Sequence, residues 1–239
     1  MSKRALIVLA AALIGAGFAF VALDARAQHT PDNTATVTIN TSASARIADI
    51  VAFHENFMAE DHAYSPAARA EAQRRLNALK NDAGNVSQAY FELELSRIVA
   101  LADNGHTAAL PWPRATRYNR IPLRFAAFGE DFYVVRAPAQ SADLLGARLT
   151  AIDGHVITQL RTASRSLMGG VNGWRDRFAN YLFESPEQLH AMDLAANAAG
   201  ATYRLKTANG EILERRFEGA VVAAATRLPS TRTASSNRW

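Results

Sequence analysis

The first side chains with possible chemistry are His54 and His62, with three carboxylates between them, a group that a divalent metal could bind. The carboxylates are those of Glu55, Glu60 and Asp61. On a helix, the step from the first histidine to the second spans about 12 Å, at about 1.5 Å per residue. Ligands of one zinc ion lie about 2 Å from the metal, so this spacing argues against a shared site. We therefore expect no metal site, and interpret His54 as a hydrogen-bonded histidine on the buried face of a helix.

No side chain stands in a motif that activates a nucleophile for attack on a carbonyl. The sequence has no cysteine, which also excludes disulfides and cysteine-based zinc sites. No serine lies in a Gly-x-Ser-x-Gly turn, and Ser185 precedes Pro186 in the arrangement of a helix cap. The other serines considered lie on a predicted helix or in the C-terminal tail: Ser164, Ser166, Ser230, Ser235 and Ser236. Lys80 and Lys206 are expected to be surface charges, because lysine is rarely buried unless it is paired.

Three amphipathic helices are predicted in the first half of the chain. The first begins at Ile47, where apolar residues follow the i, i+3, i+4, i+7 spacing of one helix face. The second begins with Ser65 as its N-cap and Pro66 at the first helical position. The third covers residues 86–102, and we expect Gly105 to take the left-handed conformation that ends it.

After a predicted extended linker over residues 111–120, the hydrophobic pattern changes from helical to alternating. Pro111 and Pro113 favour the linker, because each disfavours helix at the residue before it. Short runs bounded by turn residues are typical of strands, at 121–128, 132–136, 147–152, 201–206 and 212–217. Asn209-Gly210 predicts a type I′ hairpin turn. Helices are expected at 158–168, 174–183 and 186–194, and residues 220–225 could form one more strand.

The predicted fold class is α+β. Residues 46–110 form a helical subdomain, and residues 121–225 form a β domain with a helical insertion.

Both ends of the chain are predicted to lie outside the folded region. Residues 1–27 have the features of a secretion signal, with an uncharged apolar run and Ala25-Arg26-Ala27 at the cleavage position. We expect removal of the signal and a periplasmic or secreted protein, with a membrane anchor as the alternative if the signal is not cleaved. Residues 28–45 predict a flexible lead-in, and residues 226–239 a disordered tail.

The composition is that of an ordinary globular protein, with 49% hydrophobic and 20% charged residues. The net charge of +4 is accompanied by no basic stripe, so we expect no nucleic-acid partner. We also expect no cofactor. The length of 239 residues, less the signal, fits two small domains.

Several stretches resemble the front portion of the tail-specific (C-terminal processing) serine peptidases, across roughly residues 47–217. They are Asp103-Asn104-Gly105-His106-Thr107, Ile121-Pro122-Leu123-Arg124-Phe125, Asp131-Phe132-Tyr133-Val134-Val135, residues 144–154, Tyr181-Leu182, and residues 185–190. The resemblance implies that residues 121–225 form a PDZ-like domain behind a helical subdomain. It covers the helical and PDZ-like portion only, and we expect the nucleophile domain of the family to be absent from this chain.

The resemblance also assigns roles to two sites. In one branch of the family, a histidine at the turn that corresponds to His106 is the general base; the alternative is a structural histidine whose ring bonds the backbone. The second site is similar to the loop of PDZ modules that receives a peptide carboxylate, followed by the edge strand to which a peptide adds. It comprises Phe128, Gly129, Glu130, Asp131 and Phe132. The alternative is a plain hairpin turn, because Glu130 and Asp131 would repel a carboxylate.

We therefore expect an exported protein that binds a peptide or an unfolded protein segment and is catalytically incomplete. Two alternatives stay open. One is a serine peptidase that is active only with a separately encoded nucleophile domain. The other is a non-enzymatic envelope adaptor or structural protein.

Overall fold

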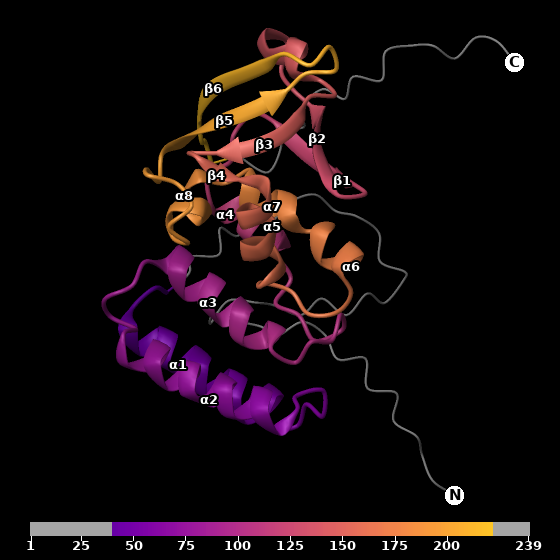
Figure 1. The fold of residues 1–239 in the computed structure, drawn as a ribbon. Helices are drawn as coiled ribbons and strands as arrows, with labels where there is room; N and C mark the ends of the chain where they lie inside the picture. Colours follow the sequence, from indigo (N-terminus) through magenta and orange to yellow (C-terminus); the bar gives the residue numbers. More distant parts are fainter. Residues whose placement is uncertain (1–39, 222–239) are drawn as a thin grey trace, which may run out of the picture.

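The computed structural model describes residues 40–221 and has the predicted α+β fold, with N-terminal helices followed by a six-stranded antiparallel sheet (Figure 1). Three predictions lie outside the described residues: the signal peptide over 1–27, most of the lead-in, and the tail over 226–239. Among the described residues, no helix is long and apolar enough to cross a membrane.

The helical subdomain comprises α1 (Ala43–Phe53), the π-helix η1 (His54–Met58), α2 (Pro66–Asn81) and α3 (Gln88–Ala100). Serine hydroxyls cap three of these helices, because Ser42, Ser65 and Ser87 each accept a hydrogen bond from a backbone N–H three residues on. The cap at Ser65 with Pro66 behind it confirms the predicted start of the second helix. The cap at Ser42 explains why the first helix begins earlier than the predicted Ile47.

The buried face of the first helix differs from the predicted one. Ile50, Phe53 and Met58 are buried, whereas His54 is half-buried and its ring bonds no other described residue. After Phe53 the chain makes a π-turn, in which the N–H of Ala59 donates to the carbonyl of His54, five residues back. The wider turn places Met58, five residues after Phe53, on the buried face. The prediction of a hydrogen-bonded core histidine is wrong, because His54 is only half-buried and its ring bonds no other described residue.

The predicted extended linker contains a short helix, α4 (Trp112–Arg117). Pro113 does not prevent it, because a proline in the first turn of a helix has no N–H that the helix needs. Arg114 on this helix is buried and donates a hydrogen bond to the Ser96 hydroxyl on α3 at 2.7 Å. The linker prediction for these residues is therefore wrong.

The sheet has the strand order β1-β2-β3-β5-β6, and a short β4 pairs with β3. The strands are β1 (Arg124–Phe128), β2 (Asp131–Arg136), β3 (Arg148–Ile152), β4 (His155–Val156), β5 (Gly200–Lys206) and β6 (Ile212–Glu218). A 3-10 helix, η2 (Ala139–Leu144), joins β2 to β3. Residue Ala220 adds only an isolated bridge to Arg120, within a segment predicted as a further strand.

The hairpin between β5 and β6 has a longer loop than the predicted type I′ turn. The N–H of Gly210 donates to the carbonyl of Thr207 at 3.0 Å, and the N–H of Thr207 donates to the carbonyl of Glu211 at 2.9 Å. Within the loop from Thr207 to Glu211, Gly210 is the one residue with a positive φ, of 92°. This pattern matches a three-residue loop in which the glycine follows the turn, so the prediction of the turn type is wrong.

The helical insertion between β4 and β5 comprises α5 (Ile157–Arg165), α6 (Asn172–Asp176), α7 (Ala179–Phe183) and α8 (Pro186–His190). The single helix predicted over 174–183 is broken into α6 and α7. In Figure 1 these helices lie between the sheet and the helical subdomain, with α8 close to α3. Leu93 of α3 belongs to the core of the sheet domain, while Phe91 and Leu95 belong to the core of the helical subdomain, so α3 contributes to both.

Candidate functional site

Four aromatic side chains from α4, α6 and α7 line an open hollow of about 320 Å³. They are Trp112, Trp174, Phe178 and Tyr181. Phe178 lies at the centre of the group, with its ring centroid 4.9 Å from that of Trp174 and 6.1 Å from that of Trp112. Both pairs are edge-to-face, an arrangement that the ring quadrupoles favour. We call this site the aromatic hollow.

The aromatic hollow also has polar groups at its wall. Arg177 and Asn180 line it, and Arg177 forms no ion pair with any residue in the range 40–221. The guanidinium of Arg120 lies 5.5 Å from the centroid of the Tyr181 ring, within the range of a cation–π contact. Trp112 is 50% exposed, so a large apolar surface faces solvent at the edge of the site. This combination suits a ligand that carries an apolar group next to an acceptor or a negative charge.

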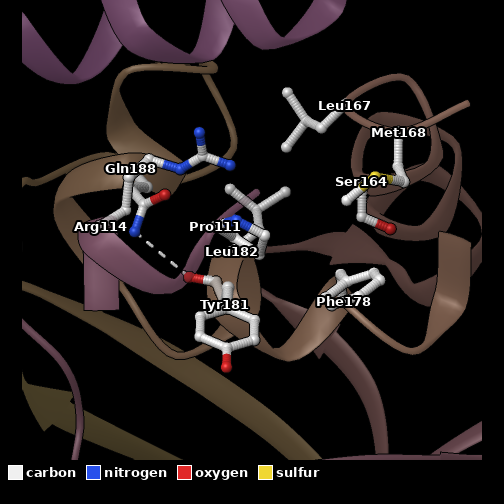
Figure 2. A pocket seen from close by; sticks show the side chains of 9 residues that line it. All are labelled: Pro111, Arg114, Ser164, Leu167, Met168, Phe178, Tyr181, Leu182 and Gln188. Atoms are coloured by element: carbon white, nitrogen blue, oxygen red, sulfur yellow. Dashed lines mark hydrogen bonds between the residues drawn. The ribbon is translucent and has the colours of Figure 1, made fainter. Parts of the chain in front are cut away.

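A second, much smaller cavity lies behind the aromatic hollow. Phe178 and Tyr181 line both spaces. Figure 2 shows the side chains that line the smaller cavity. The smaller cavity has a volume of about 10 Å³ and is lined by residues that include Arg114 and Gln188. Gln188 is buried and is held by a hydrogen bond from its amide Nε2 to the carbonyl of Tyr181 at 3.2 Å.

His106 lies in the turn after α3, and its side chain is exposed. Its backbone N–H donates to Asn104 Oδ1 at 2.9 Å, and its ring makes no hydrogen bond within residues 40–221. The left-handed residue at the end of α3 is Asp103, with a φ of 48°, and not the predicted Gly105. Aspartate tolerates this conformation better than most residues that have a side chain.

Gly105 lies beside the aromatic hollow. A Cβ atom at this position would lie 3.4 Å from the indole of Trp174, at ordinary van der Waals distance. The same turn is held by Asp103, whose carboxylate accepts the N–H of Gly170 at 3.1 Å and pairs with Arg175. The structure thus brings the turn that contains His106 next to the aromatic hollow, although His106 itself does not line the hollow.

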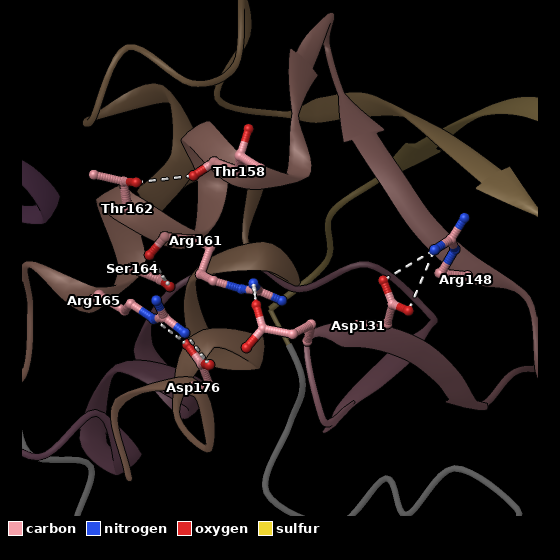
Figure 3. Close-up of polar contacts among 9 residues, drawn as sticks. Asp131, Arg148, Thr158, Arg161, Thr162, Ser164, Arg165 and Asp176 are labelled. Carbon is pink, nitrogen blue, oxygen red and sulfur yellow. Dashed lines mark hydrogen bonds and ion pairs between the residues drawn. The ribbon is translucent and has the colours of Figure 1, made fainter. Parts of the chain in front are cut away.

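The predicted carboxylate loop is a tight hairpin turn. Phe128 pairs with Asp131 across it, and Gly129 has a φ of 60°, as the first central position of a type II′ turn requires. Glu130 is 84% exposed and pairs with Arg161 of α5, while Asp131 pairs with Arg148 of β3 (Figure 3).

The strand that follows this turn is not at the edge of the sheet. β2 lies between β1 and β3, and on the β3 side the N–H and carbonyl of Val134 bond Ala147 and Gly146. A peptide cannot add to a strand whose two sides are already paired. The side chain of Phe132 is also buried, at 1% exposure. The prediction of an edge strand beginning at Phe132 is therefore wrong.

No described serine hydroxyl bonds a histidine ring. Ser185 caps α8 as predicted, accepting the N–H of Gln188 at 3.3 Å. Ser164 and Ser166 donate to carbonyls of their own helix, those of Arg161 and Ala163. Lys80 and Lys206 are exposed, as predicted.

Sequence reasoning did not identify the aromatic hollow. The available signal was the spacing of Trp174, Phe178 and Tyr181 at i, i+4 and i+7, which is also the spacing of an ordinary buried helix face. Trp112 lies between two prolines in a segment interpreted as a linker. In the described part of the chain, no cluster of three or more histidine, aspartate or glutamate side chains could hold a metal ion.

No family model matches the sequence, and the search of curated proteins finds no match. Solved structures that are similar include three of CPAF. A crystal structure of a CPAF mutant has a TM-score of 0.47 and 13% identity, covering 76% of this chain and 34% of that chain. The structure of mature CPAF complexed with lactacystin has a TM-score of 0.45 and 13% identity. The match covers 74% of this chain and 35% of that chain. The crystal structure of mature CPAF has a TM-score of 0.40 and 12% identity, and the match covers 74% of this chain and 34% of that chain. The present chain therefore spans about a third of the length of each of these three chains.

Proposed function

We propose that this chain is an exported peptide-binding protein that corresponds to the non-catalytic front of a tail-specific serine peptidase. In this proposal, residues 121–225 are the PDZ-like part, and the aromatic hollow takes an apolar side chain of a peptide or of an unfolded protein segment. In this proposal the hairpin at 128–132 is not the binding site, because β2 pairs with β1 on one side and, at Tyr133 and Val134, with β3 on the other.

The aromatic hollow is the observation that carries the proposal. Its volume of about 320 Å³ lies at the lower end of the range of small-ligand sites. Tryptophan and tyrosine dominate the energetics of peptide and protein binding sites, because they bury a large area with few rotatable bonds. Asn180 can bond a peptide group, and Arg177, which has no ion pair within residues 40–221, can bond a carboxylate of the ligand.

Tryptophan fluorescence provides the test of binding. The chain has three tryptophans, of which Trp112 and Trp174 line the aromatic hollow and Trp239 lies outside the described residues. In a Trp239→Phe background, a short tryptophan-free peptide that ends in two leucines should change the emission in a saturable way. Trp112→Ala should weaken its binding about tenfold or more, since truncation of a binding hot spot costs about 2 kcal/mol.

Phe128→Ala is the matched control, because Phe128 is an exposed aromatic residue at the β1–β2 turn. This variant should bind the peptide as the parent does. Equal binding by Trp112→Ala and the parent would contradict the aromatic hollow as the site. Weaker peptide binding in Phe128→Ala alone would instead place the binding site at the β1–β2 hairpin.

The non-catalytic part of the proposal has a separate test. Attack on a peptide bond requires an activated hydroxyl with a base in hydrogen-bond reach. A serine-reactive fluorophosphonate probe should therefore not label the purified chain. Labelling that His106→Ala abolishes in a folded protein would instead identify a peptidase with His106 as its base.

Export is tested independently by N-terminal sequencing of the protein from its native cell. The expected mature protein starts at Gln28 and is found in the periplasm or the medium. Recovery of intact Met1 in the membrane fraction would contradict export with cleavage and favour an uncleaved anchor.

A further inference from the structure

The last strand of the sheet, β6, has backbone groups without a partner along its outer edge. β1 and β6 are the two edge strands of the sheet (Figure 1). In an antiparallel pair, residues that exchange backbone hydrogen bonds alternate with residues that do not. β6 follows β5 without a register shift, and the Gly219 N–H donates to the Ala199 carbonyl at 2.7 Å, so the odd-numbered residues of β6 bond β5. The backbone groups of the even-numbered residues point away from β5 and bond nothing within residues 40–221: Ile212, Glu214, Arg216 and Glu218.

The other edge strand, β1, is protected, whereas β6 is not. Native proteins protect an edge strand by covering it, by a bulge, or with proline and lysine. At β1, the Phe125 N–H is already bonded to the Glu184 carboxylate at 2.8 Å, and the register with β2 shifts before Phe125. β6 has seven residues, no register shift, no proline and no lysine. The bridge from Arg120 to Ala220 covers this edge only beyond the end of β6. A second strand can therefore reach the outer backbone groups of β6.

The charges along β6 are complementary to those of a second, antiparallel copy of the same strand. Glu214 and Arg216 are exposed and lie on the same face of the sheet. When Glu214 lies opposite Arg216 of the second copy, twofold symmetry creates the reciprocal pair as well. This register also brings the outward backbone groups of the two strands opposite one another, and on the other face it places Leu213 opposite Phe217. A register that sets Glu214 or Arg216 opposite its own copy places like charges together, which is destabilising.

We propose that two copies of this chain associate through β6, as an antiparallel pair in which Glu214 of each copy lies opposite Arg216 of the other. Arg215 then faces its own copy at the twofold axis. Its charge is already balanced, because Asp143 accepts hydrogen bonds from its two terminal nitrogens at 3.3 and 2.8 Å. The association joins two sheets into one. It is independent of the proposed peptide binding, because no residue of β6 lines the aromatic hollow.

The ion pairs that Glu214 and Arg216 make within one chain do not prevent this contact. Glu214 pairs with Arg204 of β5, and Arg216 pairs with Glu218, and all four side chains are about half exposed or more. Exposed ion pairs contribute little to stability, so exchanging them for pairs between copies costs little. The gain comes from the backbone hydrogen bonds of the outer edge, which only another strand can complete.

Sedimentation equilibrium of the purified chain tests the association. One strand edge is a small interface, so we expect a monomer–dimer equilibrium between about 1 μM and about 1 mM. Glu214→Arg and Arg216→Glu should each raise the dissociation constant of the dimer about tenfold or more, because both pairs across the axis then oppose like charges. Lys206→Glu is the matched control for Arg216→Glu. Lys206 is exposed on the same face, but on β5, so the dimer should persist.

A mixture of the two single variants identifies the register. In an equimolar mixture of Glu214→Arg and Arg216→Glu, each pair across the interface joins an arginine to a glutamate. The mixture should therefore dimerise as the parent does, which would also show that both variants fold. A parent that stays monomeric at about 1 mM would overturn the proposal, as would a dimer that both single variants leave unchanged. The same holds for a mixture as weakly associated as either variant, if both variants melt at the temperature of the parent.

Hydrogen exchange of the parent gives a result that needs no variant. The N–H groups of Glu214 and Arg216 should exchange fast in dilute solution and become protected in concentrated solution. Those of Leu213 and Arg215, which bond β5, should be protected in both. Fast exchange at Glu214 and Arg216 under both conditions would contradict pairing through β6.

Discussion

The backbone N–H of Phe125 donates a hydrogen bond to the carboxylate of Glu184 at 2.8 Å. This contact joins β1 to the residue that ends α7. The carboxylate is fully buried, and it is paired with Arg120 and with Arg124, the latter at 3.4 Å. Burial lowers the pKa of Arg124 to about 10, which reflects the cost of placing these charges out of water. Glu184 therefore connects the sheet with the helices that form the aromatic hollow.

Glu184→Gln should destabilise the chain by about 3–5 kcal/mol, because it leaves two partly buried arginines without their carboxylate. The amide oxygen of the glutamine can still accept the hydrogen bond from the Phe125 N–H. The loss of stability therefore measures the effect of removing the negative charge. Urea unfolding of the two proteins measures the difference. Glu187→Gln, at a residue without an ion pair to the described residues, should change stability by less than about 0.5 kcal/mol. Similar losses in the two variants would refute the assigned role of Glu184.

Gly169→Ala should destabilise the chain by about 1–3 kcal/mol, the usual cost of forcing an atom into a packed site. A Cβ atom at Gly169 would lie 2.6 Å from the backbone nitrogen of Asn104, in the turn that contains His106. Gly173→Ala is the matched control, since a Cβ atom there meets nothing within 4 Å and Gly173 lies on α6. It should be neutral or slightly stabilising. Thermal unfolding of both variants checks this pair, and equal effects would disprove close packing at Gly169.

Stability should fall as the pH rises above about 10. Burial raises the pKa of Tyr203, Tyr64 and Tyr118, so the unfolded chain releases these phenolic protons before the folded chain does. A raised folded-state pKa contributes stability that is complete below the unfolded pKa of 10.0 and is lost above it. Arg124 acts in the opposite direction, since burial lowers its pKa to about 10, but the effect of this one group is outweighed by that of the three tyrosines.

Tyr203→Phe tests this dependence. At neutral pH the variant should lose about 1–3 kcal/mol, because the Phe183 carbonyl loses the hydrogen bond that the Tyr203 hydroxyl donates at 2.7 Å. Between pH 10 and pH 11, its stability should fall less steeply than that of the parent, by up to about 1.4 kcal/mol per pH unit. Parallel stability curves over this range would contradict the assignment.

His106→Ala should change stability by less than about 0.5 kcal/mol, because the side chain is exposed and its ring bonds no described residue. Asn104→Ala should cost more, about 1 kcal/mol, because it removes the acceptor of the His106 N–H. Chemical unfolding of the two variants gives the comparison. A larger loss for His106→Ala than for Asn104→Ala would show that the imidazole has a structural role after all.

The sequence determined the order and type of most elements, because local patterns report local structure. The N-caps at Ser65 and Ser185, each followed by proline, predicted two helix starts that the structure confirms. The alternating runs predicted all the strands of the sheet except the two-residue β4. Local patterns were less reliable at the π-turn after Phe53 and at α4. A wider turn and a proline in the first helical turn both depend on how neighbouring elements pack.

The tertiary structure alone decided which residues meet. Strand order is a long-range property, so the sequence could not show that β3 covers the side of β2 that the predicted peptide groove required. The aromatic hollow brings Trp112 beside Phe178, 66 positions later in the sequence, and no local period connects the two. Arg114 is recognisable as a buried, incompletely bonded cation only after α4 has packed against α3. Chemistry that depends on side chains far apart in the sequence is fixed by packing, whereas caps and strand runs are fixed by neighbours along the chain.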